Sequence, residues 1–375
     1  MDLALIALRL LAFLVGVVLI GLAVLSALRT FVLPRGARDP ITRRVFQGLR
    51  RLLDLRLRSV HDYKIRDNVL ALYVPIGLLV LPLVWLALVT LGFAGVYWAL
   101  GVRTPVEAFL LSGSSLLTLG FVPADGVLFS ALAFLEAAIG LILVALLIAY
   151  LPTMYAAFSR RERAVNLLEV RAGTPPSAVE LLLRFNRLGR LDQLTDLWID
   201  WEAWFAEVEE SHTSLAMLVF FRSPNPNRSW VTASGAVLDA ASLTAAFLDI
   251  PRNAQVDLCI RAGYLALREV AAYFQIPFPT DPRPDDPISI RREEFDAACD
   301  RLAEHGLPVK PDRDQAWKDF AGWRVNYDSV LIDLARMTTA PPDVPWSTDA
   351  ARRTYHPPRP SPESRRAASP AGGLL

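Results

Sequence analysis

A short apolar stretch, residues 104–126, carries the pattern in this chain that could stabilise an ion. Thr104 can cap a helix, Pro105 suits the first helical position, and Glu107 lies in the first turn, where the helix macrodipole favours an anion. The helix is predicted to continue to about Leu117. Its carboxyl end carries partial negative charge, so a cation just beyond Leu117 would be stabilised.

The residues that follow this helix, Thr118 to Pro123, are apolar or small and are predicted to be extended. Extended backbone at membrane depth is tolerated only where it is buried in protein or lines water. This stretch is therefore a candidate re-entrant loop. Asp125 follows it at the predicted outer mouth, where several copies of the carboxylate would raise the local cation concentration; a solvated loop residue is an equally good interpretation.

Two ionisable residues lie inside apolar runs. Glu136 is a functional candidate by that fact alone, either as a supporting acid hydrogen-bonded to the helix before the loop or in contact with the ion, and we favour the supporting role. Arg9 is expected to reach the membrane surface or to face a neighbouring helix. No apolar run repeats basic residues at every third position, so voltage sensing of the usual kind is not expected.

The polar half of the chain carries little that predicts catalysis. The run from Asp196 to Glu210 is acidic and ends at His212, a pattern typical of a solvated helix face. The histidines form no ligand spacing with Cys259 or Cys299, so no metal or cofactor is expected beyond permeant K+ or Na+. A nucleophile elbow and a G-x-G-x-x-G after a strand are both lacking, so we expect neither an enzyme nor a nucleotide-binding regulatory domain. The net charge of +1 alone says nothing about nucleic acid, and no nucleic-acid partner is expected of the predicted channel.

Three apolar runs are long enough to place the loop in a lipid bilayer. They cover Leu3–Leu28, Val69–Leu100 and Val127–Leu151, and about 20 helical residues cross a hydrocarbon core of roughly 30 Å. The first run lacks a basic start and a clean cleavage site, so we interpret it as a retained helix rather than a secretory signal. Pro75 and Pro82 are expected to bend the second run.

Basic residues predict the topology. Between residues 29 and 66, arginines and lysines far outnumber aspartates, which makes this stretch cytoplasmic by the positive-inside rule. The N-terminus is then outside, the C-terminal domain is cytoplasmic, and Arg160, Arg161 and Arg163 lie just inside the membrane after the third run. The composition suggests a bacterial inner (plasma) membrane, and a disulfide between the two cysteines is not expected in the cytosol.

The chain is predicted to divide at residues 28, 66, 158 and 340. Residues 1–28 form the first span, 29–66 a basic linker with an amphipathic interfacial helix over 41–60, and 67–158 the pore domain. Residues 159–340 form a helical cytosolic domain in two lobes that could bind an unknown ligand, with the proline-rich connection 277–287 between them. Residues 341–375 are predicted to be disordered. Helices of the cytosolic domain are predicted over 178–188, 191–220, 231–248, 253–274, 290–305 and 314–337.

The region from Val69 to Glu162 resembles the pore domain of potassium channels and their tetrameric cation-channel relatives. Ala108 to Ser112 matches the alanine-aromatic pore helix, and Ser114 to Phe121, S-S-L-L-T-L-G-F, aligns with the pattern that ends T-V-G-Y. The resemblance implies that the backbone carbonyls of the filter residues replace the hydration shell of the ion. Those residues would be Thr118, Leu119, Gly120, Phe121 and Val122, and Gly140 would be the hinge of the inner helix.

One departure bears on selectivity. The family continues G-Y-G-D, whereas Val122 and Pro123 stand here at the second glycine and the acid. A β-branched residue enters the positive-φ conformation of that glycine only with strain. The string T-L-G-F-V-P instead resembles the T-x-G-x-x-P filters of cyclic-nucleotide-gated channels, which implies weak discrimination between sodium and potassium.

The expected fold class is an all-α membrane protein with three transmembrane helices, a re-entrant pore helix and filter loop, and an α-helical cytosolic domain. The expected function is a homotetrameric channel for monovalent cations. Each chain contributes one pore loop, through which the ions pass, and the cytosolic domain regulates the channel. The alternative is a channel-like membrane protein that does not conduct and acts as a sensor or scaffold. Val122 keeps this alternative open.

Overall fold

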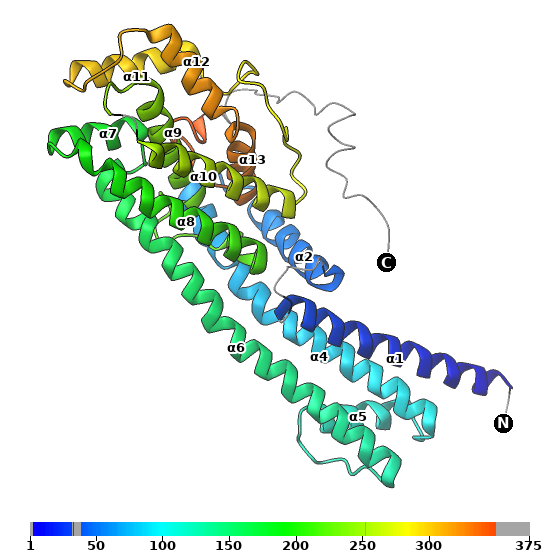
Figure 1. The fold of residues 1–375 in the computed structure, drawn as a ribbon. Coiled ribbons are helices and arrows are strands. Elements are labelled where there is room, and N and C mark those ends of the chain that lie inside the picture. The colour runs from blue at the N-terminus through cyan, green and yellow to red at the C-terminus, as the bar shows by residue number, and fades with distance from the viewer. Residues whose placement is uncertain (1–2, 32, 34–38, 252, 350–375) are drawn as a thin grey trace. The chain divides into compact units, whose positions relative to one another are not determined.

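The protein is all-helical in residues 3–31, 33, 39–251 and 253–349, which are the residues that the structure, a computed structural model, describes (Figure 1). No strand occurs within these ranges. The chain divides into two compact units, Met1–His61 with Asn68–Ala156, and Asp62–Asp67 with Ala157–Leu375. The helices are α1 (Leu3–Phe31), α2 (Pro40–Arg56), α3 (Tyr63–Ala71), α4 (Tyr73–Leu100), α5 (Pro105–Leu116), α6 (Val127–Ala172), α7 (Ala178–Arg187), α8 (Leu194–Ser214), α9 (Trp230–Phe247), α10 (Ala254–Tyr273), α11 (Arg292–Glu304), α12 (Arg313–Arg324) and α13 (Asp328–Thr338), with short 3₁₀ helices η1 (Leu191–Gln193) and η2 (Ala216–Phe220).

α1 packs along α4 in the first unit because small residues let the two backbones approach each other (Figure 1). A Cβ atom added to Gly92 would lie 2.8 Å from the carbonyl oxygen of Gly16. One added to Gly95 would lie 2.9 Å from the carbonyl oxygen of Ala12. A larger side chain at either glycine of α4 would therefore push the helices apart.

A buried chain of hydrogen bonds fixes the start of α2 against α1 and α4. Trp85 Nε1 donates to Ser26 Oγ at 2.8 Å, and Ser26 Oγ donates to Asp39 Oδ2 at 2.6 Å. The same carboxylate caps α2 by accepting the backbone N–H of Thr42 at 2.7 Å. α2 thus occupies most of the stretch that the sequence predicts to be an amphipathic helix.

The second apolar run is interrupted near its start. Pro75 has no backbone N–H, and its ring would clash with the carbonyl of Ala71, four residues earlier. α3 ends at Ala71 and α4 begins at Tyr73, whereas Pro82 is accommodated within α4. The break therefore lies before the first proline, at the residue whose carbonyl that proline excludes.

α6 is much longer than the apolar run that predicts it. It continues to Ala172 and passes through Arg160–Arg163, where the sequence predicts the end of the span. From Ala157 onward the helix belongs to the second unit, where Val165 and Leu168 are buried in the core. The arginines mark the end of the apolar surface, and the helix itself continues because its next face is buried by other helices.

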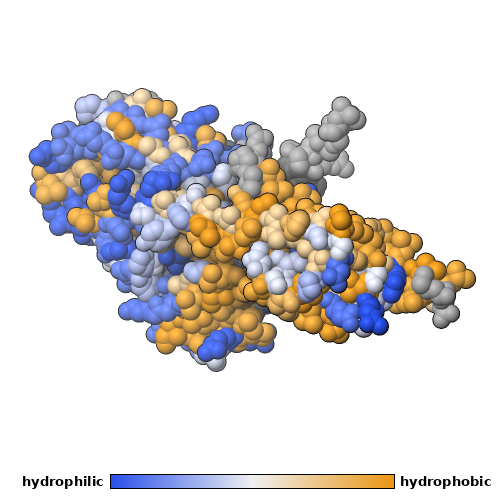
Figure 2. All heavy atoms as spheres, turned by 90° about the horizontal axis from the view of Figure 1, so that it is seen from below, coloured by the Kyte–Doolittle hydropathy of each residue, from blue (hydrophilic) through white to orange (hydrophobic). Residues whose placement is uncertain are grey.

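Several helices leave large apolar side chains uncovered. Among the described residues, four helical segments are long and apolar enough to cross a membrane: α1, α3 with α4 (Tyr63–Leu100), α6 and α9. α1, α4 and α6 carry exposed leucines, isoleucines and valines, and Figure 2 shows such apolar surface in orange. α9 differs because it is almost entirely buried, as an apolar core helix of a globular domain is. The long apolar helices are compatible with a multi-pass membrane protein.

The second unit has one continuous core around α9, which packs against α7, α10, α12 and α13. Phe278 and Ile288, on either side of the proline-rich connection, pack against this same core, so the prediction of two lobes was wrong. The prolines shape the connection, but its apolar side chains are still buried. Two of the predicted helices are split, 191–220 into η1, α8 and η2, and 314–337 into α12 and α13.

The predicted disordered tail does not begin at Pro341, because residues 341–349 fold onto the second unit. Val344 and Ser347 are fully buried, and Arg324 donates to the carbonyl of Trp346 at 2.6 Å. Arg324 is itself buried and also pairs with Asp239, so the tail supplies one of the acceptors that a buried guanidinium needs. The rest of the predicted tail, residues 350–375, lies outside the described residues.

Candidate functional site

α5 positions the candidate loop, and its cap is as the sequence predicts. Thr104 Oγ1 accepts the backbone N–H of Glu107 at 3.2 Å, and Pro105 occupies the first turn. α5 packs on α4 through a buried face that includes Ala108 and Leu111. The helix ends one residue before the predicted end, so its carboxyl end directly precedes the loop.

The chain leaves α5 through a Schellman motif, in which two hydrogen bonds close the end of the helix. The N–H of Leu119 donates to the carbonyl of Ser114 at 2.8 Å, and the N–H of Thr118 donates to the carbonyl of Ser115 at 3.0 Å. Thr118 has a φ of 54°, in the left-handed region that costs an L-residue roughly 1–2 kcal/mol and that glycine usually occupies here. The backbone is therefore strained at the first residue of the candidate filter.

Ser114 also holds the rest of the loop. Its carbonyl accepts the N–H of Gly120 at 3.4 Å, and its hydroxyl accepts the N–H of Val122 at 3.1 Å. Gly120 has a φ of 71°, whereas Val122 is not among the residues with positive φ in the described chain. The left-handed positions are thus Thr118 and Gly120, and Val122 avoids the strain that a potassium-type filter would impose on it. The sequence motif includes Ser114 but did not indicate that this residue would hold the loop; a serine in an apolar helix next to a loop is the signal that could have done so.

The carbonyl oxygens of the loop are the feature of it that bears most on ion binding. Within the described residues, the backbone carbonyls of residues 117–123 accept no hydrogen bond. The side chains of Leu117, Leu119 and Phe121 are 55%, 61% and 59% exposed. One chain alone therefore leaves both a set of unpaired acceptors and uncovered apolar side chains, and backbone acceptors away from water need partners.

Glu136, on α6, lies behind α5 and is fully buried. Its carboxylate accepts hydrogen bonds from the hydroxyl of Ser112, on α5, and from that of Tyr97, on α4, at 3.0 Å for the tyrosine. These three side chains join α4, α5 and α6 within the first unit. Glu136 thus makes the hydrogen bond to α5 on which the predicted supporting role depends, but sequence reasoning did not identify Ser112 or Tyr97 as its partners.

Gly140 lies where α6 passes the end of α5. A Cβ atom at this position would lie less than 3.0 Å from the carbonyl oxygen of Leu116 and 3.0 Å from its Cδ1. The structure thus gives Gly140 a packing role beside the hinge role that the resemblance implies. Asp125 is exposed beyond the loop. The guanidinium of Arg9 lies 5.9 Å from the ring centre of Trp98, on a neighbouring helix as the sequence allowed.

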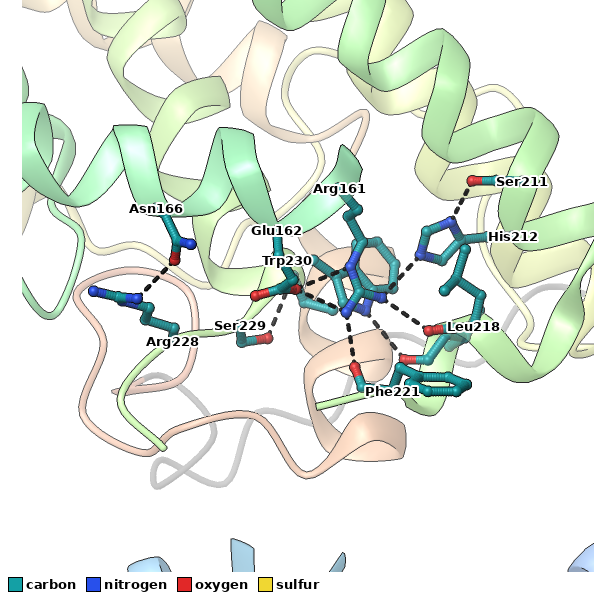
Figure 3. A network of polar contacts seen from close by, with 12 residues as sticks. Arg161, Glu162, Asn166, Ser211, His212, Leu218, Phe221, Arg228, Ser229 and Trp230 are labelled. Atoms are coloured by element: carbon teal, nitrogen blue, oxygen red, sulfur yellow. Dashed lines mark hydrogen bonds and ion pairs between the residues drawn. The ribbon is translucent and has the colours of Figure 1, made fainter. Parts of the chain in front are cut away.

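A second polar cluster lies in the second unit on the later part of α6 (Figure 3). Arg161 is 2% exposed, and its guanidinium donates to Glu162 and to the carbonyls of Leu218 and Phe221, each at 2.8 Å. Nη1 of Arg161 also lies 3.3 Å from Nε2 of His212. Because a guanidinium can only donate, this histidine nitrogen must be the acceptor.

His212 in this cluster is held in its neutral form. Burial, with a contribution from the positive charge of Arg161, lowers the pKa of His212 well below its ordinary value of 6.5, so the ring is neutral. Ser211 Oγ lies 3.1 Å from Nδ1 of this ring, but the nearby Glu162 is bound to the arginine. No group of three or more histidines, cysteines and acids that could hold a metal occurs among the described residues.

A cavity of about 1190 Å³ opens in the second unit between the starts of α8 and α10, the end of α9, and α12. Trp198 and Trp323 contribute aromatic walls, and Lys318 and Asp257 contribute charges of both signs. Its volume is somewhat above the roughly 300–1,000 Å³ of most small-molecule sites, so it is large enough to hold a small molecule.

Comparison of the chain with protein-family models, with curated proteins and with solved structures found no match.

Proposed function

We propose that the protein is a tetrameric channel for monovalent cations that conducts through the loop Thr118–Val122. The observation that carries the proposal is the set of carbonyl oxygens of residues 117–123, at the carboxyl end of α5, that accept no hydrogen bond within the described residues. Oxygens of this kind can replace the water around a dehydrated ion, and the helix end adds partial negative charge.

The tetramer follows from the number of loops. One chain supplies one loop after α5, whereas a ring of carbonyl oxygens around an ion needs several. The exposed side chains of Leu119 and Phe121 would be covered by neighbouring subunits. In this arrangement the three membrane spans are α1, α4 and the apolar part of α6, and α5 with the loop enters the membrane from outside.

The proposed orientation places the N-terminus outside and the second unit in the cytoplasm of a bacterial cell. It rests on the arginines between α1 and α4 and on those that follow the apolar part of α6. Asp125 then lies at the outer mouth, where four carboxylates would attract cations.

Weak selectivity between potassium and sodium is part of the proposal. Val122 takes no left-handed conformation, so a second glycine-like turn of the filter is missing from the loop. Fewer ordered carbonyl rings leave fewer positions at which ion size is distinguished. Reversal potentials measured across asymmetric KCl and NaCl should differ by little, and a strong preference for potassium would overturn this part while leaving the channel proposal intact.

Regulation by the cytosolic unit has a physical route in α6. The helix that would line the pore continues into the second unit, so movement in that unit would act on the pore around Gly140. The cavity beside Trp198 and Trp323 offers a site for a regulating ligand.

The direct test is cation flux into liposomes that contain the purified protein. Wild-type protein should carry thallium or potassium, and native mass spectrometry should show four chains. Gly120→Ala places a side chain at a φ of 71° and should abolish flux. Gly21→Ala, where an added Cβ would meet nothing within 4 Å, is the matched control and should conduct normally.

The alternative function is a membrane sensor or scaffold that does not conduct. The observation that favours it is the Schellman motif itself, because Leu119 and Gly120 donate to Ser114 and tie the loop to α5. A folded protein without flux under any ionic condition would support this alternative, whereas a monomer would overturn the channel proposal.

A further inference from the structure

Two segments of chain that lead to apolar helices are bound to the same five residues of the second unit, Leu218–Arg222. The first is Asp62–Asp67, which precedes the main part of the second apolar run and belongs to the second unit. The other is the later part of α6, which carries Arg161. We call Leu218–Arg222, the end of η2 and the two residues after it, the tie segment.

The bond to α6 uses the backbone of the tie segment. Arg161 donates to the carbonyls of Leu218 and Phe221, both at 2.8 Å, and is held in place by Glu162 (Figure 3). The ring of Phe158, one turn earlier on α6, lies 5.4 Å from the ring of Phe221. Because the guanidinium is buried, these acceptors cannot be replaced by water, and the tie segment must follow α6 if α6 moves.

The bond to the start of the second run uses the side chain of Arg222. Its guanidinium pairs with Asp67, and it donates to the hydroxyl of Tyr63 at 3.1 Å. The side chains of Arg222 and Asp67 are only 10% and 6% exposed. The same guanidinium donates to the carbonyls of Thr338 and Thr339 at 2.7 and 2.6 Å, which anchors the pair to the end of α13.

The two bonds meet at one peptide unit. The carbonyl of Phe221 accepts from Arg161, and the next residue along the chain is Arg222, which holds Asp67. A displacement of α6 therefore changes the position of the backbone that carries Arg222. A chain of buried, charge-assisted hydrogen bonds resists stretching far more than an exposed pair does.

We propose that the tie segment couples the cytosolic ends of the second and third spans, so that α6 and the start of the second run shift together rather than independently. Only the effect of this coupling on flux rests on the proposed channel function. The coupling itself is a property of the fold and requires no conduction.

The experiment is hydrogen–deuterium exchange of the full-length protein in lipid nanodiscs, combined with flux on the same variants. Arg222→Met removes the bond to Asp67, and Arg161→Met removes the bond to the tie segment. Arg160→Met is the matched control, since Arg160 neighbours Arg161 on α6 but pairs with Glu207 at the surface, where the two side chains are 54% and 37% exposed.

The coupling predicts that each substitution raises amide exchange in the segment that the substituted side chain does not itself contact. Arg222→Met should accelerate amide exchange at least tenfold in residues 157–163, and Arg161→Met should do so in residues 62–67, by the reciprocity of linked sites. Arg160→Met, the control for Arg161→Met, should leave residues 62–67 unchanged. Exchange that rises only around the residues in contact with the substituted side chain would overturn the coupling.

If either methionine variant fails to fold, a milder pair of substitutions serves for the same comparison. Tyr63→Phe removes only the hydroxyl that Arg222 binds, and Arg161→Lys keeps the charge but not the forked geometry. Smaller increases at the opposite end, in the same directions, are expected from both. If the variants show the reciprocal change in exchange but the wild-type protein carries no flux, the coupling is supported and the channel is rejected. If the wild-type protein carries flux but the variants show no reciprocal change, the channel is supported and the coupling is rejected.

Discussion

Replacing Gly140 with alanine should separate α6 from the end of α5. The added Cβ atom would lie less than 3.0 Å from the carbonyl oxygen of Leu116, and a backbone oxygen cannot rotate away as the end of a side chain can. One of the helices must therefore move by roughly 0.5–1 Å, and overpacking of this kind costs about 1–3 kcal/mol. That free energy corresponds to a shift of about 5- to 150-fold in the equilibrium between the packed and the separated arrangement.

Alanine also favours a helix over glycine by up to about 1 kcal/mol, so the comparison needs a glycine without a close neighbour. Gly21→Ala provides this control, since it lies in a helix with nothing within 4 Å of the added Cβ. Thermal unfolding in detergent and flux in liposomes should both change for Gly140→Ala relative to Gly21→Ala. Equal melting temperatures and equal flux in the two variants would refute the packing argument and the hinge together.

Three further outcomes are expected. Thr118→Gly should raise the melting temperature, corresponding to at most about 1 kcal/mol, because glycine takes the left-handed conformation without strain while adding freedom to the unfolded chain; a lower melting temperature would contradict the strain. Flux should fall, because the resemblance to potassium channels implies that the hydroxyl of Thr118 contributes to the inner end of the filter. Tyr97→Phe should lower stability by about 1.5–3 kcal/mol in denaturant unfolding, since the buried carboxylate of Glu136 loses a donor, and a neutral effect would argue that water replaces it. Because the pKa of His212 is lowered in the fold, the unfolded chain binds more protons below pH 6.5, so the stability of the second unit should fall with decreasing pH below that value, by up to about 1.4 kcal/mol per pH unit, and His212→Gln should flatten this dependence.

The sequence predicted best those features that depend on neighbouring residues. Thr104, Pro105 and Glu107 form a complete helix start within four positions, and the structure has that cap. The break before α4 also follows from one proline. By contrast, the sequence predicted no helix over residues 164–172, where α6 continues, because the arginines at 160–163 report the surroundings of a helix rather than its length.

The candidate site was less predictable because its partners are distant in the chain. Glu136 was identified from its charge in an apolar run, whereas Ser112 and Tyr97 became visible only when α4 and α5 were brought beside it. Arg161 likewise binds backbone carbonyls more than 50 residues away, and a carbonyl carries no sequence signal. The left-handed conformation of Thr118 ran against local preference, which is where a pattern-based prediction fails.

The length of α6 gives it leverage. About 32 residues separate Gly140 from Ala172, and at 1.5 Å per residue they span about 48 Å. A tilt of only about 5° about Gly140 would carry the far end through about 4 Å, which is more than a hydrogen-bond length. A small change in the tilt of α6 would thus correspond to a displacement of several ångströms at its carboxyl end. Conversely, a displacement of that size at the carboxyl end would change the tilt at Gly140 by only a few degrees.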